Sequence, residues 1–272
     1  MDREALIRGK TLFLFDMDGT LYLGERLYPF TLDLLRTIRE TGRNYLFVTN
    51  NSSKSVSAYV EKLARLGIDS REEDFLTSSQ ATAWYLHREL EGKTLYVCGT
   101  RSLTEELTRE GFAVTTRPEE AQAVVMGFDT ELTFQKLHDV SWLLLTCPDI
   151  PYIATNPDLV CPTEFGSVPD CGSVCQMLKN VSGRTPTVIG KPSPLMVELA
   201  LEKQSVPRER ACVVGDRIYT DVKSALNAGV TGILVMSGET TPDILAASPD
   251  RPDLVLRDGG EILDILRKRS TV

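Results

Sequence analysis

Short apolar segments rich in β-branched and aromatic residues alternate with segments of helical periodicity along most of this 272-residue chain. Strands that are apolar on both faces and separated by helices are typical of a parallel sheet covered on both sides. We therefore expect an α/β protein with a doubly wound parallel sheet. The expected strands are Thr11–Phe15, Tyr45–Val48, Thr94–Val97, Ala123–Met126, Tyr152–Ala154, Thr187–Ile189, Ala211–Val214, Gly232–Met236 and Asp253–Leu256. The expected helices are Thr31–Glu40, Ser55–Leu66, Leu132–Leu145, Leu195–Lys203, Tyr219–Ala228 and Glu261–Arg267.

Two polar breaks interrupt this pattern and indicate a domain boundary. They lie at Thr77–Gln80 and at Ser182–Pro186, and about a hundred residues separate them. The strand ends with the most reactive side chains fall outside this interval. We therefore expect a core formed by residues 1–79 and 185–272, with a second α/β unit inserted at residues 80–184.

Four of the expected core strands end in residues that can take part in chemistry. In a parallel α/β sheet, active residues gather at the carboxyl ends of the strands. The other strand ends, including the one after Gly232–Met236, have fewer side chains that can take part in a reaction. The candidates in chain order are Asp16, Asp18, Thr49, Asn50, Asn51, Lys191, Asp216 and Asp221.

The composition excludes several classes of function. The only histidines, His87 and His138, lie in helix-like stretches, which leaves little basis for a Ser-His-Asp triad or a multi-histidine zinc site. The six cysteines include no C-x-x-C pair, so a zinc ribbon is excluded. The formal net charge of −8 argues against binding to nucleic acid or to an anionic membrane surface. With no signal-like or membrane-length apolar run, we expect a cytoplasmic protein with reduced thiols.

The candidate residues together indicate chemistry on a phosphate group. Asp16 and Asp18 are close enough to repel each other, which is tolerable with a cation or a shared proton. Oxygen ligands without histidine or thiolate suit Mg²⁺ best. Thr49 and Asn50 precede an expected helix, and helix N-termini bind phosphate. A Mg²⁺ site beside such an anion site indicates phosphoryl transfer.

These motifs, in this order, closely resemble those of the haloacid dehalogenase-like phosphohydrolases. The resemblance covers nearly the whole chain and narrows to the NagD-like, 4-nitrophenylphosphatase-type branch. That branch has a Rossmann-like core and a large C2-type cap domain between its second and third motifs, where the insertion is expected here. The matching segments are Asp16–Thr20, Leu21–Gly24, Thr49–Ser52, Ala154–Asp158, Gly190–Pro194 and Gly215–Asp221.

The resemblance implies a hydrolytic mechanism with two aspartates after the first strand. Asp16 is the expected nucleophile, which forms an aspartyl-phosphate. Asp18 is expected to protonate the leaving oxygen and then to take a proton from the attacking water. Ion-pumping ATPases of the same superfamily have threonine at the position of Asp18 and keep a long-lived aspartyl-phosphate. An aspartate there favours a phosphatase.

The resemblance also implies the cofactor and the residues that bind phosphate. Mg²⁺ is expected between the Asp16 carboxylate, the Asp18 backbone carbonyl and Asp216, with Asp221 supporting it directly or through water. The residues expected to bind the phosphate are Thr49, Asn50, Asn51 and Lys191. Thr49, the Asn50 backbone and Lys191 would hold the phosphoryl oxygens as charge shifts in the transition state.

The inserted unit offers two further candidates. Asn156 and Asp158 either contact the substrate or form an Asn-Pro-Asp turn, and both interpretations stay open. The expected substrates are small phosphomonoesters such as sugar phosphates, nucleoside monophosphates and 4-nitrophenyl phosphate. A homodimer is a further possibility that the resemblance raises.

Two alternative functions are compatible with a reactive strand-end aspartate. A mutase-like phosphotransferase on the same fold differs from a phosphatase only in how it excludes water. A non-catalytic phospho-accepting signalling domain also uses an aspartate, a threonine and a lysine, but such a domain is about half this length. Catalytic release of inorganic phosphate distinguishes the phosphatase from the signalling domain.

Overall fold

The computed structural model describes residues 2–163 and 165–268. The chain divides into two compact units. The core unit comprises the residues up to Thr49, Tyr59–Leu76 and the residues from Lys191 onward, and the inserted unit comprises Asn50–Ala58 and Thr77–Gly190. The boundaries expected from the sequence, after residues 79 and 184, differ because residues 50–58, 77–79 and 185–190 group with the inserted unit. The assignment of a catalytic core and a cap to these units stays a prediction.

The core unit is built on a six-stranded sheet with the strand order β15-β14-β13-β1-β4-β5. The pairs that join β15 through β4 are parallel. All residues of β1 are buried, because this central strand has a neighbour on each side and helices on both faces. The strands are β1 (Leu12–Phe15), β4 (Asn44–Thr49), β5 (Phe75–Thr77), β13 (Ala211–Gly215), β14 (Thr231–Val235) and β15 (Leu254–Leu256).

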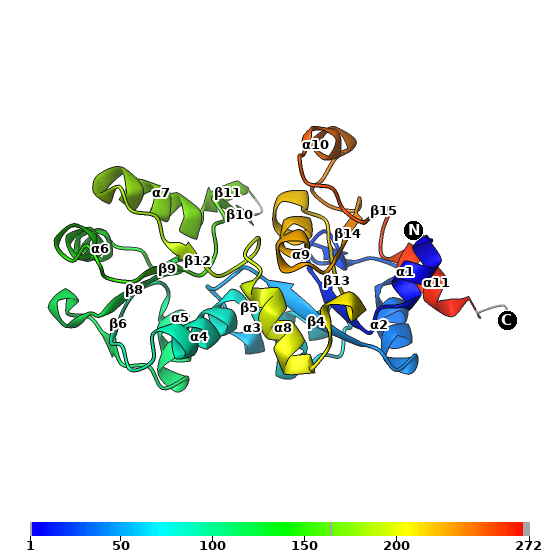
Figure 1. The fold of residues 1–272 in the computed structure, drawn as a ribbon, viewed down its shortest axis with the longest axis horizontal. Coiled ribbons are helices and arrows are strands. Elements are labelled where there is room, and N and C mark those ends of the chain that lie inside the picture. The colour runs from blue at the N-terminus through cyan, green and yellow to red at the C-terminus, as the bar shows by residue number, and fades with distance from the viewer. Residues whose placement is uncertain (1, 164, 269–272) are drawn as a thin grey trace. The chain divides into compact units, whose positions relative to one another are not determined.

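Two groups of helices flank the core sheet (Figure 1). In one group α1, α2 and α11 pack together, and in the other α8 packs against α9. A short hairpin, β2 (Tyr22–Leu23) with β3 (Arg26–Leu27), follows β1. The remaining elements are α1 (Arg3–Arg8), α2 (Thr31–Glu40), α3 (Val56–Arg65), η1 (Glu72–Asp74), α8 (Leu195–Gln204), η3 (Arg208–Arg210), the π-helical turn η4 (Ile218–Val222), α9 (Lys223–Ala228), α10 (Pro242–Ala247) and α11 (Gly260–Arg267).

The inserted unit has its own five-stranded parallel sheet with the order β12-β9-β8-β6-β7. Helices α6 and α7 pack together on one side of it, and α4 and α5 lie on the other (Figure 1). Its elements are α4 (Ser78–Glu89), β6 (Leu95–Cys98), α5 (Arg101–Arg109), β7 (Val114–Thr115), η2 (Pro118–Glu120), β8 (Ala123–Met126), α6 (Phe134–Thr146), β9 (Tyr152–Ala154), the hairpin strands β10 (Val160–Thr163) and β11 (Gly166–Pro169), α7 (Cys171–Ser182) and β12 (Thr187–Val188).

The expected fold class, a doubly wound parallel α/β sheet with a second α/β unit, is confirmed. The polar segment at Thr77–Gln80 lies where the chain passes from the core unit to the inserted unit, and it forms the start of helix α4. Thr77 Oγ1 accepts a hydrogen bond from the Gln80 N–H (3.2 Å), and Gln80 Oε1 accepts one from the Thr77 N–H (3.0 Å). This reciprocal pair is a capping box, whose residues are polar because they satisfy the first turn of a helix.

None of the helices in the described ranges combines the length and the apolar character needed to cross a membrane.

Candidate active site

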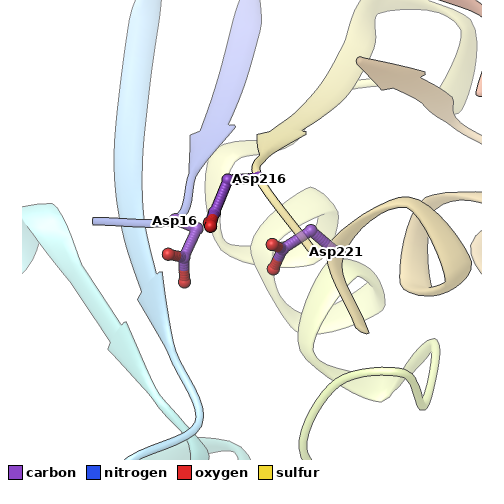
Figure 2. A group of neighbouring side chains, drawn as sticks. All are labelled: Asp16, Asp216 and Asp221. Carbon is purple, nitrogen blue, oxygen red and sulfur yellow. The ribbon is translucent and has the colours of Figure 1, made fainter. Parts of the chain in front are cut away.

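Three carboxylates from neighbouring strand ends converge at the carboxyl edge of the core sheet. Figure 2 shows Asp16 directly after β1, Asp216 directly after β13 and Asp221 in η4. One oxygen of each lies within 4.8 Å of the others, and no other described residues form such a group of three possible metal ligands. Since β1 and β13 are adjacent and parallel, their ends must meet at one edge.

Lys191 lies among these carboxylates and is itself buried. Its ammonium group donates to Asp16 Oδ1 and to Asp221 Oδ1, each at 2.7 Å, and to the Val48 carbonyl at 3.2 Å. Burial alone would lower the pKa of Lys191, but the charges of Asp16 and Asp221 raise it above its usual value. The side chain therefore carries a positive charge, as the sequence analysis expected of a phosphate-binding lysine.

The cluster holds more negative than positive charge. Burial and the charge of Asp16 raise the pKa of Asp216 to about 7. Burial also raises the pKa of Asp221, to about 6, although the charge of Lys191 opposes this rise. Three carboxylates facing one ammonium group fit a divalent cation with a preference for oxygen ligands, and Mg²⁺ is such a cation. The donor set therefore fits the expected cofactor.

The turn after β1 explains how Asp16 and Asp18 both lie at the end of a buried strand. Gly19 has a φ of +83°, and a Cβ atom at this position would lie 2.4 Å from Asp216 Oδ2. Glycine is thus required both by the backbone conformation and by the close approach of a carboxylate. Asp18 is exposed, and its Oδ1 accepts a long hydrogen bond from the Gly24 N–H (3.4 Å). The Asp18 carboxylate is not part of the three-carboxylate group.

Thr49 ends β4 next to β1, but it does not stand at a helix N-terminus as expected. Helix α3 begins at Val56, so residues 50–55 form a loop between the strand and the helix. The N–H groups that directly follow β4 are therefore those of a loop and not those of a helix N-terminus.

In the inserted unit, Asn156 and Asp158 are hydrogen-bonded to Asn50. Asn50 Nδ2 donates to both oxygens of Asp158 (3.1 and 3.3 Å), and Asn156 Nδ2 donates to the Asn50 carbonyl (3.0 Å). Ser78 Oγ donates to the same carbonyl at 2.6 Å. Asn156 is completely buried, and its Oδ1 accepts from the Asp158 N–H (3.0 Å). These side chains hold the residue that directly follows Thr49.

The Asn51 side chain accepts hydrogen bonds from within its own loop. Its Oδ1 accepts hydrogen bonds from the Ser53 N–H and from Ser53 Oγ, both at 2.8 Å. The side chain is half-buried. This arrangement is an Asx-type turn, which shapes the loop after Asn50.

The sequence analysis missed the segment Ser237–Thr240, which follows β14. The Glu239 backbone N–H donates to Asp216 Oδ2 at 2.7 Å, and this bond lowers the pKa of Asp216 against the larger effect of burial. A backbone donor leaves little trace in a sequence. The available signal was Gly238, a glycine among polar residues at the end of a strand next to β13.

Comparisons with known proteins agree with this geometry. Family models described as haloacid dehalogenase-like hydrolase and HAD-hydrolase-like match residues 13–113 and 188–262. An acid sugar phosphatase of Staphylococcus haemolyticus is 31% identical over 258 residues, which cover 95% of this chain and 97% of that protein. The 5'-nucleotidase YutF of Bacillus subtilis is 32% identical over 240 residues, covering 88% of this chain and 92% of that protein.

Solved structures give the same result. The 4-nitrophenylphosphatase of Thermotoga maritima is 39% identical, with a TM-score of 0.89 and coverage of 95% of this chain and 98% of that one. NagD of E. coli K-12 is 30% identical, with a TM-score of 0.84 and coverage of 96% and 98%. The chain therefore belongs to the haloacid dehalogenase-like hydrolases, in their NagD-like branch, and is a phosphoric monoester hydrolase.

Proposed function

We propose that the chain is a Mg²⁺-dependent phosphatase that hydrolyses small phosphomonoesters through an aspartyl-phosphate on Asp16. The observation that carries this proposal is the convergence of Asp16, Asp216 and Asp221, the first and last of which pair with the buried ammonium group of Lys191. The negative charge of these carboxylates exceeds the positive charge around them, which supports a bound divalent cation. A lysine at the nucleophile supports the arrival of an anionic substrate.

The residues proposed to hold Mg²⁺ are the carboxylates of Asp16, Asp216 and Asp221 and the backbone carbonyl of Asp18. Bound there, the cation supplies the positive charge that offsets repulsion between a carboxylate and a phosphate. Asp221 is proposed to act either directly or through water. Its hydrogen bonds to Lys191 and to the Arg217 N–H fix its position in either case.

The side chains of the core unit perform the two proposed chemical steps. A carboxylate oxygen of Asp16 attacks phosphorus, and Asp18 gives its proton to the departing ester oxygen, so an alcohol leaves. Asp18, now ionised, then takes a proton from a water molecule that attacks the phosphorus and releases inorganic phosphate. Thr49, the Asn50 backbone N–H and Lys191 are proposed to hold the phosphoryl oxygens in both steps.

The proposed substrates are sugar phosphates, nucleoside monophosphates and 4-nitrophenyl phosphate. The names of the relatives support this range, since they include an acid sugar phosphatase, a 5'-nucleotidase and a 4-nitrophenylphosphatase. The inserted unit is proposed as the cap that excludes water and large substrates. Because Asn156 and Asp158 are bonded to Asn50, we propose that they act on the phosphoryl group through Asn50 and its neighbour Asn51.

A cytoplasmic location and a homodimer stay predictions. Cys98, Cys147, Cys171, Cys175 and Cys212 are thiols, which supports a reducing compartment. Light scattering coupled to size exclusion measures the oligomeric state directly. A monomer of about 30 kDa at micromolar concentration would show the dimer to be wrong.

The test is phosphate release from 4-nitrophenyl phosphate, with Mg²⁺ and then with a chelator. We expect many turnovers with Mg²⁺ and almost none without it. Acid quenching during turnover should trap the phosphoryl group on Asp16. A panel of sugar phosphates with added sugar acceptors tests the mutase-like alternative, which predicts transfer to the acceptor in place of phosphate release.

A further inference from the structure

The segment Ser237–Thr240 touches Asp216 at several points. The Glu239 N–H donates to Asp216 Oδ2 at 2.7 Å, and the Thr240 N–H donates to the Asp216 backbone carbonyl at 3.2 Å. Thr240 Oγ1 in turn accepts from the Ile218 N–H at 3.2 Å. The loop after β14 therefore binds both the side chain and the backbone of Asp216.

Gly238 brings this segment closer to the carboxylate than any other residue could. A Cβ atom at Gly238 would lie 2.0 Å from Asp216 Oδ2 and 2.5 Å from its Cγ. Contact between nonbonded heavy atoms requires about 3.5 Å, so the carboxylate would have to move. Gly19 approaches the same carboxylate from the loop after β1. Asp216 therefore lies between two glycines from two different loops.

The segment is itself held in place from both sides. Ser237 Oγ donates to the Gly19 carbonyl at 2.7 Å, and the Tyr28 hydroxyl donates to the Ser237 carbonyl at 2.6 Å. On the other side, the Glu239 carboxylate pairs with Arg217 Nε at 2.8 Å and accepts from the Tyr219 hydroxyl.

We propose that Ser237–Thr240 is a positioning segment that fixes the Asp216 carboxylate for metal binding. The proposal rests on the proposed function, because it takes Asp216 as a ligand of Mg²⁺. A hydrogen bond to one oxygen of a carboxylate restricts its rotation and orients the other oxygen. The glycine at 238 makes this bond possible, and the pairing of Glu239 with Arg217 holds the donor in place.

The first test is the variant Gly238→Ala, with Mg²⁺ binding to the full-length protein measured by calorimetry. We expect the Mg²⁺ affinity to fall roughly 10- to 100-fold, as for other residues that orient metal ligands. At saturating Mg²⁺, kcat should recover, while KM for 4-nitrophenyl phosphate changes little. A folded Gly238→Ala protein that binds Mg²⁺ as tightly as the wild type overturns the proposal.

A matched glycine control separates this effect from a general loss of stability. At Gly9, at the end of α1, an added Cβ atom would lie 3.3 Å from the nearest atom, the Ala5 carbonyl oxygen. Gly9→Ala should keep the wild-type Mg²⁺ affinity. The melting temperatures of both variants in chelator report on the fold alone.

A second pair of variants decides the question if Gly238→Ala does not fold. Glu239→Ala keeps the backbone N–H but loses the partner of Arg217, and Glu239→Gln keeps an acceptor there. We expect Glu239→Ala to lose several-fold in Mg²⁺ affinity and Glu239→Gln to lose less. Wild-type affinity in both variants contradicts the proposal.

Asp216→Asn shows which of the two proposals has failed. If this variant binds Mg²⁺ normally, Asp216 is not a metal ligand and the metal site of the proposed function is wrong, together with this inference. If it loses Mg²⁺ while the Gly238 and Glu239 variants keep it, only the positioning role is wrong.

Discussion

The two parallel sheets of this protein have the same construction but very different carboxyl edges. At the core edge, Asp16, Asp216 and Asp221 lie together, Lys191 pairs with only two of them, and burial raises the pKa of Asp216 and Asp221. At the inserted edge, the polar groups are paired with one another: the Asp129 carboxylate pairs with Lys136 at 2.7 Å, and the hydroxyls bond to each other and to the backbone. Thr155 Oγ1 donates to Ser52 Oγ at 2.9 Å, and the Phe128 N–H donates to the same oxygen at 3.0 Å.

The contrast distinguishes a sheet edge whose side chains favour a bound ligand from an edge whose side chains stabilise the fold. Polar groups that satisfy one another in a buried place stabilise the structure and need no ligand. Carboxylates with too little positive charge around them are destabilising until a cation binds, and proteins keep such groups mainly at functional sites. The carboxyl ends of parallel strands thus bring polar side chains together. An excess of negative charge among these side chains indicates a functional site.

The largest expected effect is at the core edge. Asp16→Asn removes the attacking oxygen's charge and should reduce kcat by on the order of 10⁴-fold or more, while the fold survives. Phosphate release from 4-nitrophenyl phosphate measures this loss. The matched control is Asp139→Asn in the inserted unit, where the buried carboxylate already accepts from Tyr96 and Gln135. If Asp16→Asn is as active as this control, the proposed mechanism is wrong.

The next effect concerns Asp18, which is exposed and outside the carboxylate cluster. Asp18→Asn should reduce turnover by roughly 10²–10⁴-fold, the usual contribution of a general acid–base group. The loss in kcat/KM, which reports the step in which the alcohol leaves, should be smaller for 4-nitrophenyl phosphate than for a sugar phosphate, because nitrophenolate leaves without a proton. An equal loss in kcat/KM with both esters would argue against proton donation by Asp18.

A smaller effect is expected at the inserted edge. Asn156→Ala removes one of the two side-chain hydrogen bonds to the Asn50 carbonyl and should lower kcat/KM roughly 10- to 100-fold by misplacing the loop that is proposed to bind phosphate. Since Asn156 is completely buried, the loss should be the same for every ester in a panel. A change in the ranking of substrates would instead identify Asn156 as a substrate contact. Asn180→Ala, at an exposed amide on α7, is the control.

The smallest effect is a pH dependence of stability. The pKa values of Asp216 and Asp221 are raised, so the native state binds more protons than the unfolded state between about pH 4 and 7. The free energy of unfolding without metal should therefore fall as the pH rises through this window, by about 1.4 kcal/mol per pH unit for each fully titrating proton. Urea titrations in chelator test this slope.

Saturating Mg²⁺ should flatten the same slope, because the cation replaces the protons on Asp216 and Asp221. For the same reason the Mg²⁺ affinity should weaken as the pH falls below about 7. An identical slope with and without Mg²⁺ would show that the cation does not bind at these carboxylates.

The sequence predicted the central strands well and brought Asp16, Asp216 and Asp221 to one edge of the sheet, because each has a strong local signal. The buried apolar runs of β1 and β8 stand out from their surroundings, and Asp16, Lys191 and Asp216 directly follow such runs or a short turn after them. Helix α4 was missed because its buried face includes Ser78, Ser79 and Thr82, which look polar in a pattern.

What the sequence could not show are contacts made by backbone groups or across long distances in the chain. The Glu239 donor to Asp216 is a main-chain N–H, which any residue but proline carries. The pairing of Asn50 with Asp158 joins residues 108 positions apart, and no periodicity predicts it. For this reason the sequence left the role of Asp158 open between a turn and a substrate contact.

The position of β1 in the core sheet also determines the order in which the two units can fold during synthesis. This strand pairs with residues 44–47 on one side and with residues 211–214 on the other. During synthesis the inserted unit is complete at Gly190, before β13 exists, so we expect it to be the first unit to fold. Asp216, Asp221 and the Ser237–Thr240 segment are made later. A chain that is cut short before β13 lacks these residues, so we expect it to have no phosphatase activity even when its inserted unit folds.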